Sequence, residues 1–455
     1  MTDHMEKAST SFISSLCDEF RKNNDIPPEV CKNLRVRRGL RNADGTGVLA
    51  GVTLVGNVRG YTIIDDERHA LDGKLIYRGI DVEDIVAGIT AENRFGYEEV
   101  VYLILFGQLP NKKQLDFFKN LLDEHRPLPK NFTEDMIIKT PSPNIMNKLA
   151  RSVLALYSSD PNPDDTSLEN MLRQSIELIA RIPIIAAQAY QVKRHYYAND
   201  SMYLHIPPAG LSTAETFLYC IRPDKQYTEE EAHLLDLCLI LHAEHGGGNN
   251  SAFACRVLSS SGTDTYSAIS AAIGSLKGPL HGGANAQVEK MFADIEENVS
   301  DWKDDDEVEQ YLRRIIRKEV GDKSGKIYGM GHAVYTISDP RAKLLKKFAR
   351  KLAVDRGFID RFELIESVER LTPKVFLEEK GDQKMICANV DMYSGMVYEM
   401  LGIPKDLYTP IFAVARMVGW CAHRIEEVLF GGRIIRPAYK SISPDAEYIR
   451  LADRK

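Results

Sequence analysis

Two short segments of this chain hold a histidine and an aspartate in settings that suit acid–base chemistry. LKGPLHGGAN (276–285) places His281 beside two glycines, and ANVDMYSG (388–395) places Asp391 among apolar and aromatic neighbours. Burial among such neighbours raises the pKa of an unpaired carboxyl group, which suits a base that removes a carbon-bound proton. A helix N-cap is the alternative role for Asp391. If the two segments meet in the fold, they predict proton abstraction from a small substrate.

The turn around His281 predicts a neutral imidazole. Pro279 stiffens the approach, Gly282–Gly283 are expected to leave backbone N–H groups free, and a helix is expected to start near Ala284. The positive end of a helix disfavours a charged imidazolium, so His281 should be neutral near pH 7. A neutral ring there can donate a hydrogen bond to an oxygen that becomes negative; the alternative is a histidine that only caps the turn.

A third segment, LILHAEHGGGNNSAF (239–253), is expected to end a helix in two histidines and three glycines. Glycines after a helix end allow positive φ angles and a close approach of the backbone to a ligand. His242 and His245 could bind a metal, HGGG could form an oxyanion hole, or the histidines could hydrogen-bond an anionic substrate. The oxyanion hole of a hydrolase needs a G-x-S-x-G motif, which the sequence lacks, and the metal site lacks a third ligand nearby.

Two arginines and another histidine could recognise such an anion. KIYGMGHAVYTISDPRA (326–342) places His332 just after Gly329 and Gly331, nine residues before Arg341. The glycines do not complete a G-x-G-x-x-G pattern, so a dinucleotide loop is not expected. His332 and Arg341 could polarise a carbonyl group and pair with a carboxylate.

Arg416 stands inside an otherwise apolar helical segment, and His423 follows on the same face. Burying an unpaired guanidinium costs several kcal/mol, so Arg416 needs an anion. Arg436, just before a proline, is a second candidate anion clamp. Together these residues match a small polycarboxylate beside a proton-abstracting base, without a phosphate loop, flavin signature or metal cage.

Composition excludes several other classes of function. The chain has 455 residues, is 44% hydrophobic and carries a net charge of −7, which predicts two or three domains and no nucleic-acid binding. No apolar run reaches the length of a membrane span. Seven scattered cysteines without a CxxC pair predict reduced thiols in a cytoplasmic compartment.

Helical periodicity dominates the elements that must position these residues. Residues 1–45 are polar and predict an extra helix and a loop, whereas 47–79 alternate like strands and predict one or two small hairpins. After these strands we expect an almost wholly helical chain. Helices are expected near 98–106, 111–125, 167–190, 229–245, 265–276, 284–296, 306–318, 340–353, 359–370 and 410–430.

The ordered set of motifs resembles the citrate synthase family from about Gly47 to about Tyr439. The set comprises the histidine-rich helix end, G-P-x-H-G-G-A-N, G-x-G-H, D-P-R, N-V-D-x-Y-S-G, F-A-x-x-R-x-x-G-W-x-A-H and a closing R-P. The resemblance implies that Asp391 takes a proton from the methyl group of acetyl-CoA. His281 would hydrogen-bond the enol or enolate oxygen, and His332 would hydrogen-bond the ketone of oxaloacetate.

The same resemblance implies the rest of the site and its assembly. His245, Arg341 and Arg416 would bind oxaloacetate, and Arg436 would reach the site of the partner subunit in a homodimer. The enol would attack the ketone to give citryl-CoA, and water would hydrolyse the thioester to release citrate and CoA. The reaction belongs to the tricarboxylic acid cycle and would need no metal or redox cofactor.

The fold implied by the resemblance is all-α, with two helical domains and a small β-hairpin near the N-terminus. After an N-terminal extension over 1–45, residues 46–281 with 397–455 would form a large domain, and 282–396 a small domain on the CoA side. Closure of the domains over oxaloacetate would build the acetyl-CoA site.

The chain departs from the family pattern at several positions. The usual H-A-D-H-E has Glu244 and Gly246 here, and Ala333, Thr336 and Ala438 replace arginines that hold CoA phosphates in relatives. Lys326 and Lys277 are candidate substitutes for those phosphate contacts. The alternatives are a 2-methylcitrate synthase that uses propionyl-CoA, a metal-dependent hydrolase and a non-catalytic paralogue.

Overall fold

The computed structural model describes residues 13–454 apart from 15, 43, 66 and 382–384. The chain divides into two compact units, Met1–Gly51 and Val52–Lys455. In the first unit, the backbone is helical over 13–14 and 16–23, and α2 spans Pro28–Asn33. The expected extra helix and loop are therefore present, although the first twelve residues of the expected extension lie outside the described residues.

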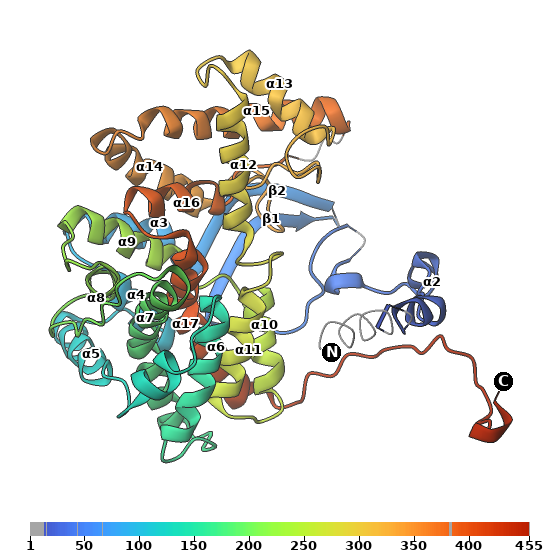
Figure 1. Cartoon of the computed structure of the whole chain (residues 1–455), viewed down its shortest axis with the longest axis horizontal. Helices are drawn as coiled ribbons and strands as arrows, with labels where there is room; N and C mark the ends of the chain where they lie inside the picture. Colours follow the sequence, from blue (N-terminus) through green and yellow to red (C-terminus); the bar gives the residue numbers. More distant parts are fainter. Residues whose placement is uncertain (1–12, 15, 43, 66, 382–384, 455) are drawn as a thin grey trace, which may run out of the picture. The chain divides into compact units, whose positions relative to one another are not determined.

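The second unit is predominantly helical, which confirms the all-α prediction (Figure 1). Its helices start at side-chain caps in many cases; Asn111, Ser212 and Thr228 each form a reciprocal capping box with the residue three positions on. The helices are α3 (Val82–Ala91), α4 (Tyr97–Phe106), α5 (Lys112–His125), α6 (Ile145–Leu156), α7 (Leu168–Ala198), α8 (Thr213–Ile221), α9 (Glu229–His242), α10 (Asn250–Ser259), α11 (Thr265–Leu276), α12 (Ala284–Asn298), α13 (Asp305–Ile316), α14 (Pro340–Asp355), α15 (Ile359–Lys380), α16 (Asp391–Met400) and α17 (Tyr408–Glu426).

Three antiparallel strands form the small sheet, in the order β1 (Gly56–Ile64), β2 (Glu67–Tyr77) and β3 (Ile80–Asp81). The pairing of β1 with β2 shifts between Arg59 and Tyr61, which marks a bulge. The predicted hairpin is confirmed, but residues 47–55 form no strand. Leu49, Val52 and Leu54 are exposed, and only Val55 at the end of this segment reaches the core among the residues described there.

Three predicted helix ends are clearly wrong. Helix α7 continues from the expected end at 190 to Ala198, because Gln191 and Val192 extend its buried face and Asn199 ends it in a left-handed conformation. Helix α15 continues past 370 and through Pro373, because Leu371 and Val375 extend its buried stripe. Helix α9 stops at His242 rather than at 245, so that His245 lies in the turn that follows.

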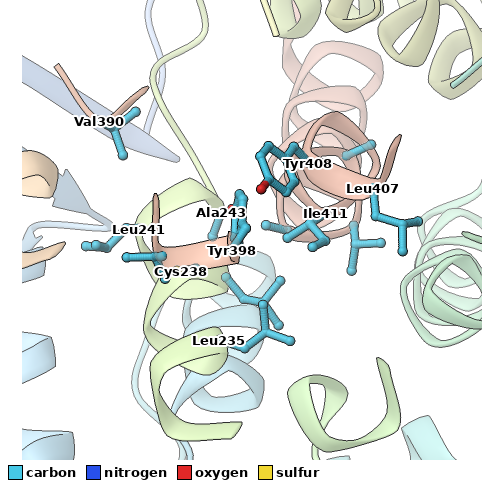
Figure 2. Close-up of a cluster of buried hydrophobic side chains, with 14 of the residues drawn as sticks. Leu235, Cys238, Leu241, Ala243, Val390, Tyr398, Leu407, Tyr408 and Ile411 are labelled. Carbon is cyan, nitrogen blue, oxygen red and sulfur yellow. The ribbon is translucent and has the colours of Figure 1, made fainter. Parts of the chain in front are cut away.

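A buried apolar cluster joins the elements that carry the candidate residues (Figure 2). Cys238 and Leu241 of α9 gather there with Tyr398 of α16 and Ile411 of α17. Val390, the residue before Asp391, belongs to the same core. The cluster therefore fixes the end of α9, the start of α16 and the first turns of α17 against one another.

Helices α12–α16 pack largely against one another, whereas α17 packs against α4, α7, α9, α10 and α11 (Figure 1). Strand β2 contacts α14, and the hydroxyl of its Tyr77 donates to the Ile240 carbonyl of α9, so the hairpin touches both groups of helices. Within the described residues, no helix combines the length and the apolar character that crossing a membrane requires. Five of the seven free cysteines are buried.

Candidate active site

The turn after α9 is held by Arg416 and Tyr77. Arg416 donates from Nε to the His242 carbonyl (2.5 Å), and Tyr77 donates from its hydroxyl to the Ile240 carbonyl (2.9 Å). Gly246 adopts a φ of 83°, which confirms the predicted left-handed glycine after the helix. The turn projects the His245 ring toward His332, with 5.1 Å between ring centroids.

His332 is fixed in one tautomer by the backbone. Its Nδ1 accepts hydrogen bonds from the N–H groups of Val334 and Tyr335, both at 3.1 Å. The neutral ring must therefore carry its proton on Nε2. The ring also stacks on Tyr335, with 4.6 Å between centroids. His332 can thus donate a hydrogen bond from Nε2 to a substrate oxygen.

A backbone bridge brings Asp391 beside the His332 loop. Gly331 donates its N–H to the Cys387 carbonyl (2.7 Å), and Asn389 donates its N–H to the Gly329 carbonyl (2.8 Å). Asp391 is the first residue of α16 and makes no side-chain cap, so the N-cap alternative is wrong. Burial raises the pKa of Asp391 to about 6, against an opposing effect of Arg341. A carboxylate with this pKa is a usable base near neutral pH.

Arg341 is oriented by an aspartate in its own motif. Its Nε and Nη2 donate to the two carboxylate oxygens of Asp339, at 3.0 and 2.7 Å. Burial lowers the pKa of Arg341, but the bidentate pair with Asp339 outweighs burial and raises it. The pairing leaves Nη1 for a further anion.

Arg416 is a completely buried cation that forms no direct ion pair with any carboxylate among the described residues. Its Nη1 and Nη2 have no hydrogen-bond partner, and its guanidinium lies 4.8 Å from the Phe412 ring centre. Burial lowers the pKa of Arg416 to about 10, so the group stays charged at neutral pH; Glu244 and Tyr77 oppose this shift. Nε2 of His245 is also buried and unpartnered. These donors predict a bound carboxylate.

His281 is neutral, as predicted, but mainly for another reason than the one expected. Burial, and then the charge of Arg416, lowers the pKa of His281 to about 4. The N–H groups of Gly282 and Gly283 are not free, because they donate to the carbonyls of Leu276 and Gly278 at 3.0 and 3.3 Å. The turn folds back on α11 and uses both donors. Helix α12 begins at Ala284, as predicted.

Ser251 is a residue that the sequence motifs did not single out. Its Oγ lies 3.1 Å from Nε2 of His281, accepts a hydrogen bond from Trp420 Nε1 (3.1 Å), and donates to Asn249 Oδ1 (2.9 Å). The serine connects the ring of His281 to the N-terminus of α10 and to α17.

Glu244 is a second residue whose role the motifs did not reveal. It is fully buried, and its Oε1 accepts from His423 Nε2 (2.8 Å) and from the Gly246 N–H (2.5 Å). Burial raises the pKa of Glu244, but His423 and Arg416 outweigh burial and lower it. His423 thus pairs with Glu244 rather than with a substrate, and the carboxylate partly compensates the charge of Arg416.

The structure leaves three of the sequence-predicted residues outside this group. Arg436, Lys277 and Lys326 are exposed, whereas His245, His281, His332, Arg341, Asp391 and Arg416 are buried or half-buried. His242 hydrogen-bonds the Cys238 carbonyl (2.9 Å) and packs against Phe412, so it shares no ligand position with His245. In the part of the chain that the structure describes, no three His, Cys, Asp or Glu side chains could hold a metal ion together.

Comparisons with known proteins show which families and structures this chain is similar to. The family model described as "Citrate synthase, C-terminal domain" covers residues 46–438. A citrate synthase of Haloferax volcanii is 35% identical over 80% of this chain and 88% of its own length. A 2-methylcitrate synthase of Shewanella oneidensis is 31% identical over 90% of this chain and 96% of its own. A Thermoplasma acidophilum citrate synthase, solved with carboxymethyl coenzyme A and oxaloacetate, has a TM-score of 0.74 and 29% identity, covering 92% of this chain and 99% of that one.

Proposed function

Because the chain belongs to the citrate synthase family, it is an enzyme that forms citrate from acetyl-CoA and oxaloacetate, and we propose a role for each residue of its site. Arg416 and His245 bind one carboxylate of oxaloacetate through their unpartnered donors, and Arg341 binds the other carboxylate from Nη1. The single observation that carries this proposal is the buried, unpaired guanidinium of Arg416. A carboxylate of a dianion such as oxaloacetate would supply the hydrogen-bond acceptors that this guanidinium lacks.

The chemistry follows from the protonation states of the three catalytic residues. Asp391 takes a proton from the methyl group of acetyl-CoA, and His281 donates a hydrogen bond to the enol oxygen. His332 polarises the ketone of oxaloacetate from Nε2, so that the enol carbon attacks the ketone carbon and citryl-CoA forms. Water then adds to the thioester carbonyl, and the C–S bond breaks to give citrate and CoA, whose thiolate takes up a proton.

Ser251 sets which nitrogen of His281 can donate. When the Ser251 hydroxyl donates to Asn249, its oxygen accepts a hydrogen bond from Nε2 of His281. Nδ1 of the neutral ring then carries no proton. Rotation of the hydroxyl toward His281 makes Nε2 an acceptor and places the proton on Nδ1. We infer that His281 donates to the enol oxygen from Nδ1 in this second arrangement, while Trp420 remains a donor to Ser251.

The proposal includes the two domains, over 46–281 with 397–455 and over 282–396, which close on oxaloacetate and exclude water. The packing of α12–α16 against one another supports this division. CoA would bind on the small-domain side, with Lys326 and Lys277 as candidate phosphate contacts. The buried free cysteines support a reducing, cytoplasmic setting. A place in the tricarboxylic acid cycle would follow from the formation of citrate from oxaloacetate.

Comparing acetyl-CoA with propionyl-CoA tests which acyl group the site takes. We expect kcat/KM with oxaloacetate to favour acetyl-CoA by about 10-fold or more, because an extra methylene is worth about 1–3 kcal/mol in a fitted pocket. CoA release would be followed with a thiol reagent and citrate by chromatography. A preference for propionyl-CoA would instead establish the 2-methylcitrate synthase alternative, which the Shewanella relative supports.

Mixing two inactive variants tests whether Arg436 acts in the partner subunit of a homodimer. Arg436 is exposed in its own chain, which supports a contribution across subunits. We expect Asp391→Ala and Arg436→Ala chains to regain activity when refolded together, because one site per heterodimer then has both residues. If Arg436 served its own subunit, no mixed dimer would contain an intact site and activity would stay lost.

A further inference from the structure

The β1–β2 hairpin lies against both segments that carry the substrate histidines. Gly56 of β1 pairs in register with Tyr77 of β2, and both residues face the turn after α9. Farther along, Gly60 and Gly73 face the loop between His332 and Arg341. The three glycines lie in the segment that the sequence predicted to form strands. The catalytic and substrate-binding roles proposed above do not involve this segment.

Gly56 makes room for the buried Glu244. A Cβ atom at position 56 would lie 2.8 Å from Glu244 Cγ and 3.1 Å from its Oε1. Glu244 in turn holds the Gly246 N–H at 2.5 Å, which shapes the turn that aims His245. The absence of a side chain at Gly56 therefore allows the hairpin to press directly on this turn.

Gly60 and Gly73 make the corresponding contact with the loop of His332. A Cβ atom at Gly60 would lie 2.6 Å from the Val334 carbonyl oxygen, and one at Gly73 would lie 2.0 Å from the Ser338 carbonyl oxygen. Both opposing atoms are backbone atoms, so a side chain could be accommodated only by moving the loop. Val334 is also one of the two residues whose N–H groups fix the tautomer of His332.

The bulge in the hairpin supplies hydrogen bonds to the same loop. Arg59 pairs with Lys74 and Tyr61 with Ala70, so β2 has an extra stretch opposite Gly60 that includes Gly73. The Gly73 N–H donates to Ser338 Oγ (3.1 Å), and that hydroxyl donates to Asp72 Oδ1 (2.8 Å). These bonds attach the bulge to the segment just before Asp339 and Arg341.

We propose that the β1–β2 hairpin is a positioning element that sets His245 and His332 relative to one another. Strand β1 packs against the turn of His245 at Gly56. The bulge packs against the loop of His332 at Gly60 and Gly73 and is hydrogen-bonded to Ser338 of that loop. The inference rests on the proposed role of His332 as the group that polarises the ketone. In this proposal the hairpin residues act on the substrate only through the two loops.

The test substitutes residues at the contact between the hairpin and the loop of His332. These variants are compared with a variant of a glycine that makes no such contact. Gly60→Ala forces the loop to move, and Ser338→Ala removes its bond to the bulge without adding atoms. Gly88→Ala in α3 is the matched control, because a Cβ atom there meets nothing within 4 Å. Circular dichroism and size-exclusion chromatography establish that each variant is folded.

The decisive readout is the ketone C=O stretch of bound, ¹³C-labelled oxaloacetate, which shifts to lower frequency when a hydrogen bond polarises the carbonyl. We expect the shift to shrink in both variants. We also expect kcat/KM for oxaloacetate to fall about 10-fold or more in Gly60→Ala and about 2- to 10-fold in Ser338→Ala, the range expected for one hydrogen bond. Gly88→Ala should keep the wild-type shift and rate.

The outcomes separate the two proposals. If the wild-type protein shows no shift of the bound ketone, the role proposed for His332 fails. If the wild type shows the shift and the folded Gly60→Ala and Ser338→Ala variants keep it undiminished, the hairpin is only structural and the inference is wrong. Should Gly60→Ala not fold, Ser338→Ala decides alone, because it introduces no clash.

Discussion

Replacing Asp391 by alanine should lower kcat for CoA release by about 10²- to 10⁴-fold, the range contributed by a positioned general base. No other carboxylate in the described site is placed to substitute for it, because Asp339 is held by Arg341 and Glu244 by His423. The rate would be measured by thiol release with saturating acetyl-CoA and oxaloacetate. Asp360→Ala is the control, since Asp360 is an exposed partner of Lys303.

The pH dependence of the wild-type enzyme provides the second part of this test. Burial raises the pKa of Asp391 to about 6, so the carboxyl group is ionised and active above that pH and protonated below it. We expect kcat/KM to fall about tenfold per pH unit below pH 6, and the residual rate of Asp391→Ala to lack this inflection. A variant that kept wild-type activity would show that another group removes the proton.

Replacing Arg416 by leucine should weaken oxaloacetate binding by about 2–5 kcal/mol, or about 30- to 5,000-fold in Kd. The reason is that Nη1 and Nη2 are buried without partners in the absence of substrate, so the carboxylate is the anion they lack. Isothermal titration calorimetry with oxaloacetate alone would measure the loss independently of catalysis.

Arg424 provides a control on the same helix. It is equally buried, but its nitrogens already donate to Thr265 Oγ1 (3.0 Å), Ser259 Oγ (3.3 Å) and the Thr263 carbonyl (2.7 Å). Arg424→Met should therefore lower the free energy of unfolding and leave the affinity for oxaloacetate within a few-fold of wild type. Equal losses of affinity in the two variants would mean that Arg416 has no special role in binding.

Sequence patterns predicted the helical class and several residues that the structure brings together, but they also included Arg436, Lys277 and Lys326, which lie outside this group. Arg416 was identified because a charge inside an apolar helix has few structural explanations, and Asp391 because apolar neighbours raise a carboxyl pKa. Helix α11 was predicted over 265–276, as observed, because its periodic segment is bounded by a cap and a glycine. These features depend on residues close together in the chain.

What the sequence could not predict depends on contacts between distant residues. The partner of Glu244 is His423, 179 positions away, and the partner of His281 is Ser251, 30 positions away. The same reason explains why the neutrality of His281 was attributed to a helix end when burial and Arg416 are the causes. Arg341 and Asp339 are two positions apart in the D-P-R motif, so their pairing could have been predicted from the sequence.

The hydrogen bonds to Nδ1 of His332 make the tautomer of this ring independent of the side chains of its loop. Main-chain N–H groups of Val334 and Tyr335 make both bonds, so among the standard amino acids proline is the one substitution that deletes either donor. Side chains along the loop can therefore diverge between relatives while the proton stays on Nε2. Ala333, an exposed residue directly after His332, therefore takes no part in fixing the tautomer of the ring.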